Sequence, residues 1–151
     1  MICLNRCFNL NYLVRYIIQE FLGKGAFGQV VKCVSPQVPG EYAVKVIKNK
    51  PAYTIQAGTE INIFQKVQED PNSGQFIVQM RDYFVYRNHV CIVFELLSYS
   101  LLEILRMTHF YGLGLKIIQF FADQLLQGLI VLERNKIIHC DLKPENVLLA
   151  S

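Results

Sequence analysis

The sequence predicts an α+β fold in which an antiparallel sheet with one helix occupies residues 16–96 and helices follow. Short β-branched or alternating segments recur up to residue 96, and a tight turn at Arg87-Asn88 separates the last two of them. From Ser98 onward the apolar residues follow helical spacing instead. The 151 residues are enough for one domain with a core, or for part of a larger one.

The predicted strands cover residues 16–22, 29–34, 41–48, 76–86 and 89–96. The segment 41–48 (EYAVKVIK) alternates apolar and polar residues, as a half-buried strand does. Helices are predicted at 53–67, 99–107 and 113–134, with a loop at 70–74 and the start of another strand at 147–149. The predicted apolar side of the longest helix consists of Ile117, Ile118, Phe121, Leu125, Leu129 and Leu132.

The charge, the cysteines and the N-terminal sequence indicate which partners and which cellular compartment to expect. The net charge of +3 comes from scattered residues, and the densest basic cluster, Lys45, Lys48 and Lys50, is a poor footprint for nucleic acid. Five cysteines without a Cys-x-x-Cys pair indicate reduced thiols. The first twenty residues lack the pattern of a signal peptide. We therefore expect an intracellular protein, in cytoplasm or nucleus, with no nucleic-acid partner.

The longest apolar stretch, residues 113–132, is interrupted by polar side chains that would be costly in lipid: Lys116, Gln119, Asp123, Gln124 and Gln127. This stretch is therefore interpreted as a core helix, and no membrane partner is expected.

The segment GKGAFGQV, residues 23–30, fits the pattern GxGxxGxV. The pattern alone is weak, and its context decides between two nucleotide folds. In a dinucleotide-binding domain the glycines open a helix, whereas β-branched residues follow Gly28 here. The segment therefore predicts a β-hairpin lid over ATP phosphates, with a simple glycine-rich turn as the alternative and a dinucleotide oxidoreductase disfavoured.

Lys45 lies in the next predicted strand, in the sequence AVK. A lysine beneath a glycine loop can bind the α- and β-phosphates if a carboxylate holds its ammonium group. Glu60, on the packing side of the following helix, is the best candidate, because Glu69 and Asp70 lie in or near a loop. We predict a Lys45–Glu60 ion pair; the alternative is that both are solvated surface charges.

The segment HCDLKPEN, residues 139–146, carries the chemical groups that phosphoryl transfer needs. Asp141 supplies a carboxylate for the attacking hydroxyl, Lys143 a cation for the phosphate and Asn146 a metal ligand. An accidental match on a surface turn is the alternative. The glycine loop and the AVK strand upstream argue against it, because they occur in the expected order.

Together these segments resemble eukaryotic protein kinases over residues 16–151, and they look most like the dual-specificity tyrosine-regulated kinases (DYRK) of the CMGC group. The resemblance rests on GKGAFGQVVK, AVKVIKNK, QAGTEI, YRNHVCIVFELLSYSL and IIHCDLKPENVLL. Cys140 stands where most kinases have arginine, a form that few kinase families share. The resemblance implies a protein-kinase-like fold with an N-terminal extension at 1–15, an N-lobe at 16–94, a hinge at 95–98 and the start of the C-lobe at 99–151.

The same resemblance implies a protein serine/threonine kinase that uses ATP and Mg²⁺ and acts on protein substrates. It places Leu22, Val30, Ala43 and Leu148 against the adenine, Gly23, Gly25 and Gly28 over the phosphates, Phe94 as gatekeeper, and Glu95 and Leu97 as hinge contacts. By the same resemblance Lys45 pairs with Glu60 and with the phosphates, Asp141 is the catalytic base, Lys143 steadies the γ-phosphate and Asn146 binds magnesium.

Later kinase motifs are missing from the sequence, which contains no Asp-Phe-Gly and no Ala-Pro-Glu. We therefore expect a kinase domain truncated after its catalytic loop, inactive by itself, whose exposed C-lobe surface needs a chaperone or partner. The alternative is a non-catalytic ATP-binding or interaction module derived from a kinase. Cys140 cannot capture a phosphorylated residue as arginine does. The resemblance implies early tyrosine autophosphorylation instead.

Overall fold

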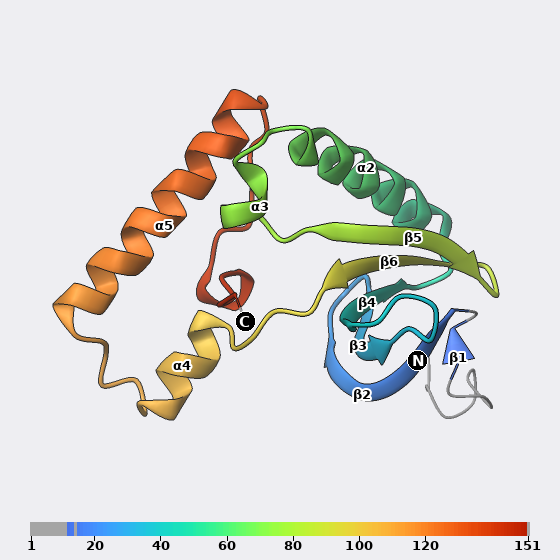
Figure 1. The fold of residues 1–151 in the computed structure, drawn as a ribbon, viewed down its shortest axis with the longest axis horizontal. Coiled ribbons are helices and arrows are strands. Elements are labelled where there is room, and N and C mark those ends of the chain that lie inside the picture. The colour runs from blue at the N-terminus through green and yellow to red at the C-terminus, as the bar shows by residue number, and fades with distance from the viewer. Residues whose placement is uncertain (1–11, 14, 151) are drawn as a thin grey trace. The chain divides into compact units, whose positions relative to one another are not determined.

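A computed structural model describes residues 12–13 and 15–150 of the chain (Figure 1). Cys3, Cys7 and most of the segment for which the sequence predicts no signal peptide lie outside the described residues. The chain forms two compact units. The first unit contains the chain up to Phe64 together with Gln79–Leu96, and the second contains Gln65–Val78 together with Leu97–Ser151.

The first unit is built on a six-stranded antiparallel sheet with the order β1-β2-β3-β4-β6-β5 (Figure 1). The strands are β1 Tyr12–Leu13, β2 Tyr16–Lys24, β3 Gly28–Val34, β4 Glu41–Ile47, β5 Met80–Tyr86 and β6 His89–Glu95. All five predicted strands are present, and β1 adds a two-residue strand before them. The tight turn is confirmed, because Arg87 and Asn88 have φ of 46° and 62°, the left-handed values of a two-residue hairpin loop.

The sheet has an apolar core on each face. Paired residues of the central strands, Val31, Val44 and Val93, are fully buried on one face. On the other face helix α2, Pro51–Gln68, packs Ala57 and Ile61 against the sheet. Burying a valine or isoleucine side chain contributes roughly 1.5–3 kcal/mol, so these two layers fix the orientation of β4 and α2.

The second unit contains the helices α3 Ser73–Phe76, α4 Leu101–Met107 and α5 Leu115–Arg134 and the short 3₁₀ helix η1 Pro144–Asn146 (Figure 1). The predicted helices at 99–107 and 113–134 are confirmed. The predicted strand start at residue 76 is wrong, as is the continuous loop at 70–74. Phe76 ends α3 instead, because its side chain packs against a buried cluster that contains Val67 and Val131.

The predicted strand at 147–149 is also wrong as a strand. Leu148 forms an isolated antiparallel bridge with Ser100, supported by backbone hydrogen bonds from Leu101 to Val147 (2.8 Å) and from Leu149 to Tyr99 (3.0 Å). The ladder stops there because the partner segment turns into α4 at Leu101.

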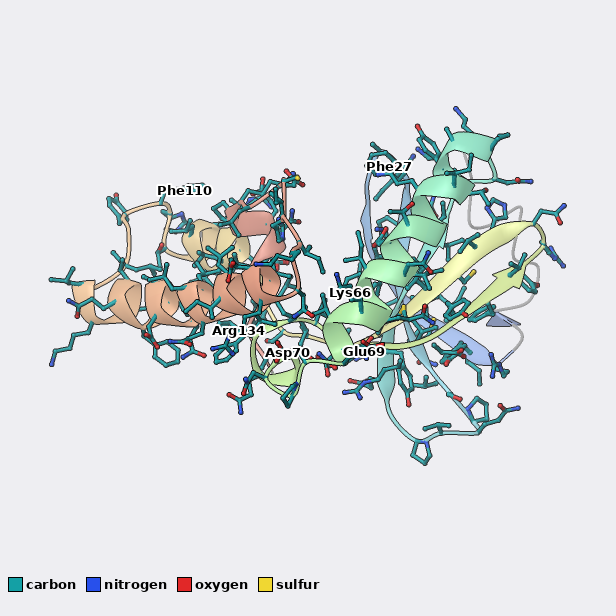
Figure 2. The ribbon with its side chains drawn as sticks, turned by 90° about the horizontal axis from the view of Figure 1, so that it is seen from above. Phe27, Lys66, Glu69, Asp70, Phe110 and Arg134 are labelled. Atoms are coloured by element: carbon teal, nitrogen blue, oxygen red, sulfur yellow. The ribbon has the colours of Figure 1, made fainter. Side chains whose placement is uncertain are left out.

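Helix α5 buries only its C-terminal part among the described residues, at Gly128, Val131 and Leu132. Gly128 faces Phe76 of α3, where an added Cβ would make an ordinary van der Waals contact of 3.5 Å with the Cβ of Phe76. Asn135, just after α5, donates to the Asp70 carboxylate at 3.2 Å, and Figure 2 shows Asp70 near the Arg134 end of the helix. Burial of α5 is therefore confined to the turns that pack against α3.

The predicted apolar side of α5 is buried only at Leu132. Ile117 and Ile118 are each 48% exposed and Leu129 is 37% exposed. The interpretation of this stretch as a core helix therefore holds only for its C-terminal turns, and the described chain leaves apolar surface exposed on α5, as expected. By length and composition α5 could cross a membrane, and 17% of its most apolar window is buried. This is weak support for a membrane span, because core helices of soluble proteins have the same composition.

Candidate functional site

The glycine-rich segment forms the turn between β2 and β3. The Gly25 amide donates to the Gly28 carbonyl at 3.0 Å and closes the loop. Gly28 is required by space, because a Cβ there would lie 2.2 Å from the Val46 carbonyl oxygen. A strand follows the loop, as predicted, so the chain lacks the helix that a dinucleotide-binding domain places there.

Lys45 and Glu60 form the predicted ion pair. The Lys45 ammonium lies 2.6 Å from one carboxylate oxygen of Glu60 and 2.8 Å from the other. Each side chain is 27% exposed, so the pair is partly shielded from water. The alternative of two solvated surface charges is therefore wrong. The pair links the end of the central strand β4 to the middle of α2, which fixes the position of a cation on the α2 face of the sheet.

Several predicted nucleotide residues share the sheet face of Lys45. Val30 is directly opposite Lys45 in the ladder, and Ala43 is directly opposite Phe94. The Phe94 ring meets Phe64 of α2 edge-on, with ring centroids 5.0 Å apart. Gly23 pairs with Val30, whereas Leu22 is 44% exposed. The strands thus bring small and apolar side chains together around one ammonium group.

The predicted hinge residues divide between the two units. Glu95 uses its amide to donate to the Gln79 carbonyl (3.1 Å), and its carboxylate accepts from the Gln79 amide (3.0 Å) and pairs with Arg81 (2.8 Å). A hinge contact at Glu95 therefore depends on its carbonyl. Leu97 and Leu148 belong to the second unit, where the Ser98 amide donates to the Leu149 carbonyl at 2.9 Å.

The predicted catalytic residues form one cluster in the second unit. An Asp141 carboxylate oxygen lies 2.8 Å from the Lys143 ammonium and accepts from the Asn146 side-chain amide at 3.0 Å. The same amide donates to the Asp141 carbonyl at 2.9 Å. The Asp141 amide donates to Nδ1 of His139 at 3.2 Å. The structure therefore brings Asp141, Lys143 and Asn146 together, and the η1 turn at Pro144–Asn146 makes the approach of Asn146 possible.

The cluster holds its carboxylate in the ionised form. The hydrogen bond from Lys143 is the main cause that lowers the pKa of Asp141 below its ordinary value, and the bond from Asn146 acts in the same direction. The same contact raises the pKa of Lys143. The side chain of Asp141 is 62% exposed and that of Lys143 is 44% exposed, so water reaches both. At neutral pH the site presents an exposed carboxylate that can accept a hydrogen bond from a hydroxyl group.

Asn146 is the predicted metal ligand of the site. No group of three or more His, Cys, Asp or Glu side chains in the described part of the chain could hold a metal ion. Mg²⁺ is commonly held by one or two side chains plus substrate phosphates, and Asn146 offers one amide oxygen for such a set.

A cavity of about 560 Å³ in the first unit is separate from the predicted nucleotide site. Its lining includes Arg15, Tyr42 and Asp82, and it shares only Glu95 with the predicted nucleotide residues.

The sequence interpretation missed three residues beside these groups. Lys48 donates to the Ala26 carbonyl in the glycine loop at 2.6 Å, and Tyr53 meets the Phe27 ring. His139 supports the Asp141 backbone. The HxD spacing signals the last of these contacts, whereas bonds to a loop carbonyl carry no pattern in sequence.

Comparison with known proteins agrees with this geometry. Residues 16–151 match the protein kinase domain, so the chain belongs to the protein kinase family, whose members use ATP and Mg²⁺ and act on protein substrates. It is 47% identical to the Dual specificity protein kinase YAK1 homolog of Arabidopsis thaliana over 91% of the chain and 14% of that protein. It is 44% identical to Dual specificity protein kinase YAK1 of Saccharomyces cerevisiae over 91% of the chain and 17% of that protein.

A third relative carries the family name that the sequence motifs indicate. The chain is 43% identical to the DYRK-family kinase pom1 of Schizosaccharomyces pombe, over 89% of the chain and 12% of that protein. The chain thus spans less than a fifth of the length of each of these three relatives. The resemblance to DYRK-type kinases is confirmed.

Proposed function

We propose that the gene product that contains this chain is a protein serine/threonine kinase of the dual-specificity DYRK type, which transfers the ATP γ-phosphate to protein hydroxyl groups. The observation that carries the proposal is the Lys45–Glu60 ion pair at 2.6 Å. An ammonium group fixed by a carboxylate below a glycine loop suits the α- and β-phosphates of a nucleotide. Family membership over residues 16–151 supports the same reaction.

In the first unit the proposed role is nucleotide binding. Val30 and Ala43 contact the adenine from the sheet face that carries Lys45. Leu22 adds to its apolar surroundings, the Glu95 backbone binds its polar edge, and Phe94 limits the depth of the site. The amides of the loop that contains Gly23, Gly25 and Gly28 face the phosphates. The proposed domain boundaries are an N-lobe at 16–94, a hinge at 95–98 and a C-lobe from residue 99.

In the second unit the proposed role is positioning of the attacking hydroxyl. The ionised Asp141 carboxylate accepts a hydrogen bond from that hydroxyl and takes its proton, while the hydroxyl oxygen bonds to the γ-phosphorus and the bond from that phosphorus to ADP breaks. A depressed pKa suits this role, because phosphoryl transfer proceeds through a loose transition state in which little basicity is required. Lys143 stands 2.8 Å from Asp141 and neutralises the phosphate oxygens. When bound, Mg²⁺ neutralises charge on the phosphates, with Asn146 as one of its ligands.

The test is phosphotransfer from labelled ATP to a basic protein substrate by the full-length gene product, followed by phosphoamino-acid analysis. We expect phosphoserine and phosphothreonine, a loss of about 10²–10⁴ in kcat for Asp141→Asn, and loss of ATP binding for Lys45→Met. Lys136→Met is the control, because Lys136 lies on the surface, where its ion pair among the described residues is with Glu133, at 3.1 Å.

Two outcomes would contradict the proposal. Full turnover by Asp141→Asn would remove the role given to that carboxylate. ATP binding without phosphotransfer by the wild-type full-length protein would favour the non-catalytic ATP-binding module instead. An intracellular location, and the need for a chaperone or partner, are proposals that expression of the protein in cells tests directly.

A further inference from the structure

The tip of the glycine loop is held by contacts from outside the nucleotide residues. The Lys48 ammonium donates to the Ala26 carbonyl at 2.6 Å, and the Lys48 backbone amide donates to the Phe27 carbonyl at 3.0 Å. The Phe27 ring meets the Tyr53 ring edge-on, with centroids 5.3 Å apart and planes at 90°. Figure 2 shows Phe27 on the side of the loop that faces the first turns of α2.

Tyr53 is itself held in place at the start of α2. Its amide donates to the Lys50 carbonyl at 3.0 Å, and the Lys50 ammonium lies 5.7 Å from the centre of its ring. The Tyr53 side chain is half-buried and packs beside the core that contains Ile47, Ala57 and Ile61. The ring that Phe27 contacts is therefore part of the same helix that carries Glu60, seven residues further on.

We propose that Lys48, Phe27 and Tyr53 form a loop latch, a set of positioning residues that fixes the tip of the glycine loop to α2. This inference rests on the proposed function. A glycine-rich loop loses much backbone freedom when it closes over a ligand, and this loss weakens binding. The latch orders the tip beforehand, so that the loop amides and the Lys45–Glu60 pair meet the phosphates in one arrangement.

The charge and location of Lys48 make it the central member of the latch. It follows the last residue of β4, three positions after Lys45. Two of its groups bind two successive carbonyls of the loop, at Ala26 and Phe27. A methionine in its place keeps the apolar length and the backbone contact but loses the ammonium bond, whereas arginine keeps a cationic donor. We expect loss of the ammonium bond to weaken binding of the ATP phosphates and not of adenine, because none of these contacts involves the strand residues proposed for adenine.

The test measures equilibrium binding of ATP and of adenosine to the full-length gene product. We expect Lys48→Met to weaken ATP binding about tenfold, the scale of one lost hydrogen bond to a charged group, and to leave adenosine binding unchanged. Lys48→Arg should restore most of the ATP affinity. Tyr53→Leu should weaken ATP binding in the same selective way. Lys66→Met, an exposed lysine in the last turn of α2, is the matched control.

Hydrogen exchange of the loop amides gives a readout that needs no nucleotide. Lys48→Met should accelerate exchange at Gly25 and the neighbouring loop amides, and Lys48→Arg should not. Unchanged exchange and unchanged ATP affinity in both Lys48→Met and Tyr53→Leu would overturn the latch alone. An equal loss of ATP and adenosine affinity would also overturn it, since that indicates a general folding defect. A wild-type protein that binds no ATP would overturn the proposed function, and the latch with it.

Discussion

Asp141 keeps two side-chain partners and a backbone bond although its side chain is 62% exposed. In the part of the chain that the structure describes, its partners lie within five residues of it, at His139, Lys143 and Asn146. Contacts this local follow from the spacing alone, which is why the sequence motif predicts the cluster. The Lys45–Glu60 pair spans 15 residues, and its prediction also needed the correct strand and helix around it.

The sequence does not predict contacts in which a side chain binds a distant backbone carbonyl, because such contacts leave no pattern in it. Lys48 and Ala26 are 22 residues apart, and the acceptor is a backbone carbonyl that any residue offers. His89 is half-buried, and its Nδ1 lies 2.7 Å from the carbonyl oxygen of Ile47, 42 residues away in the sequence. In both cases the partner is fixed by tertiary structure.

The pKa of Asp141 provides a direct test of its cluster. We expect a carboxyl titration followed by NMR to place this pKa below the ordinary value, because Lys143 and Asn146 stabilise the ionised form. Lys143→Met should raise it, and Lys136→Met should leave it unchanged. A depressed folded-state pKa means that the stabilising contribution is present at neutral pH and is lost as the pH falls through that lowered value. No movement in Lys143→Met would contradict the ion pair.

Among the secondary-structure elements, a short helix can be predicted when the residue that caps its start is visible in the sequence. Helix α4 begins at Leu101, because the Ser100 hydroxyl accepts from the Glu103 amide at 3.2 Å while the Glu103 carboxylate accepts from the Ser100 amide at 2.7 Å. This reciprocal pair is a capping box, and the sequence Ser-x-x-Glu signals it. The four-residue α3 has no side-chain cap bond and no periodicity long enough to read, which is why its segment was assigned to a loop and a strand.

Removing the cap should destabilise the second unit. Ser100→Ala leaves the Glu103 amide without its side-chain acceptor, at a typical cost of about 1 kcal/mol in the free energy of unfolding. Urea unfolding followed by circular dichroism measures this loss. Ser98→Ala serves as the control, because Ser98 is exposed and its bond to Leu149 comes from the backbone. Equal stabilities of the two variants would show that the cap does not limit the helix.

For the whole molecule, the two halves differ in how well they bury their apolar residues. The sheet of the first unit has a closed core on each face, with Val31, Val44 and Ile92 fully buried. In the second unit α5 leaves large side chains in contact with solvent, among them Leu115 (70% exposed), Phe120 (60%) and Leu126 (59%). Periodicity correctly predicts that α5 is a helix, but it cannot tell which other segments cover its faces.

We expect the 151-residue chain to self-associate through α5 when it is purified alone. Contiguous apolar surface beyond a few hundred Å² is a liability for association. Analytical ultracentrifugation over a range of concentrations measures the effect, and the double variant Phe120→Lys, Leu126→Lys should shift the chain toward monomer. Ile55→Lys, at a 73% exposed position of α2, should not. A wild-type chain that remains monomeric at high concentration would rule out this surface as the cause.

The buried thiols of the sheet can report how often the strands of the first unit separate. Cys33 and Cys91 are free and fully buried, and burial raises the pKa of each to about 12, whereas Cys140 is free and exposed. An alkylating reagent reacts with the thiolate, so it should modify Cys140 at once and the two sheet cysteines only when the strands separate. Peptide mass spectrometry over time would then report how often this sheet opens, and ATP should lengthen the interval between openings if it binds the unit.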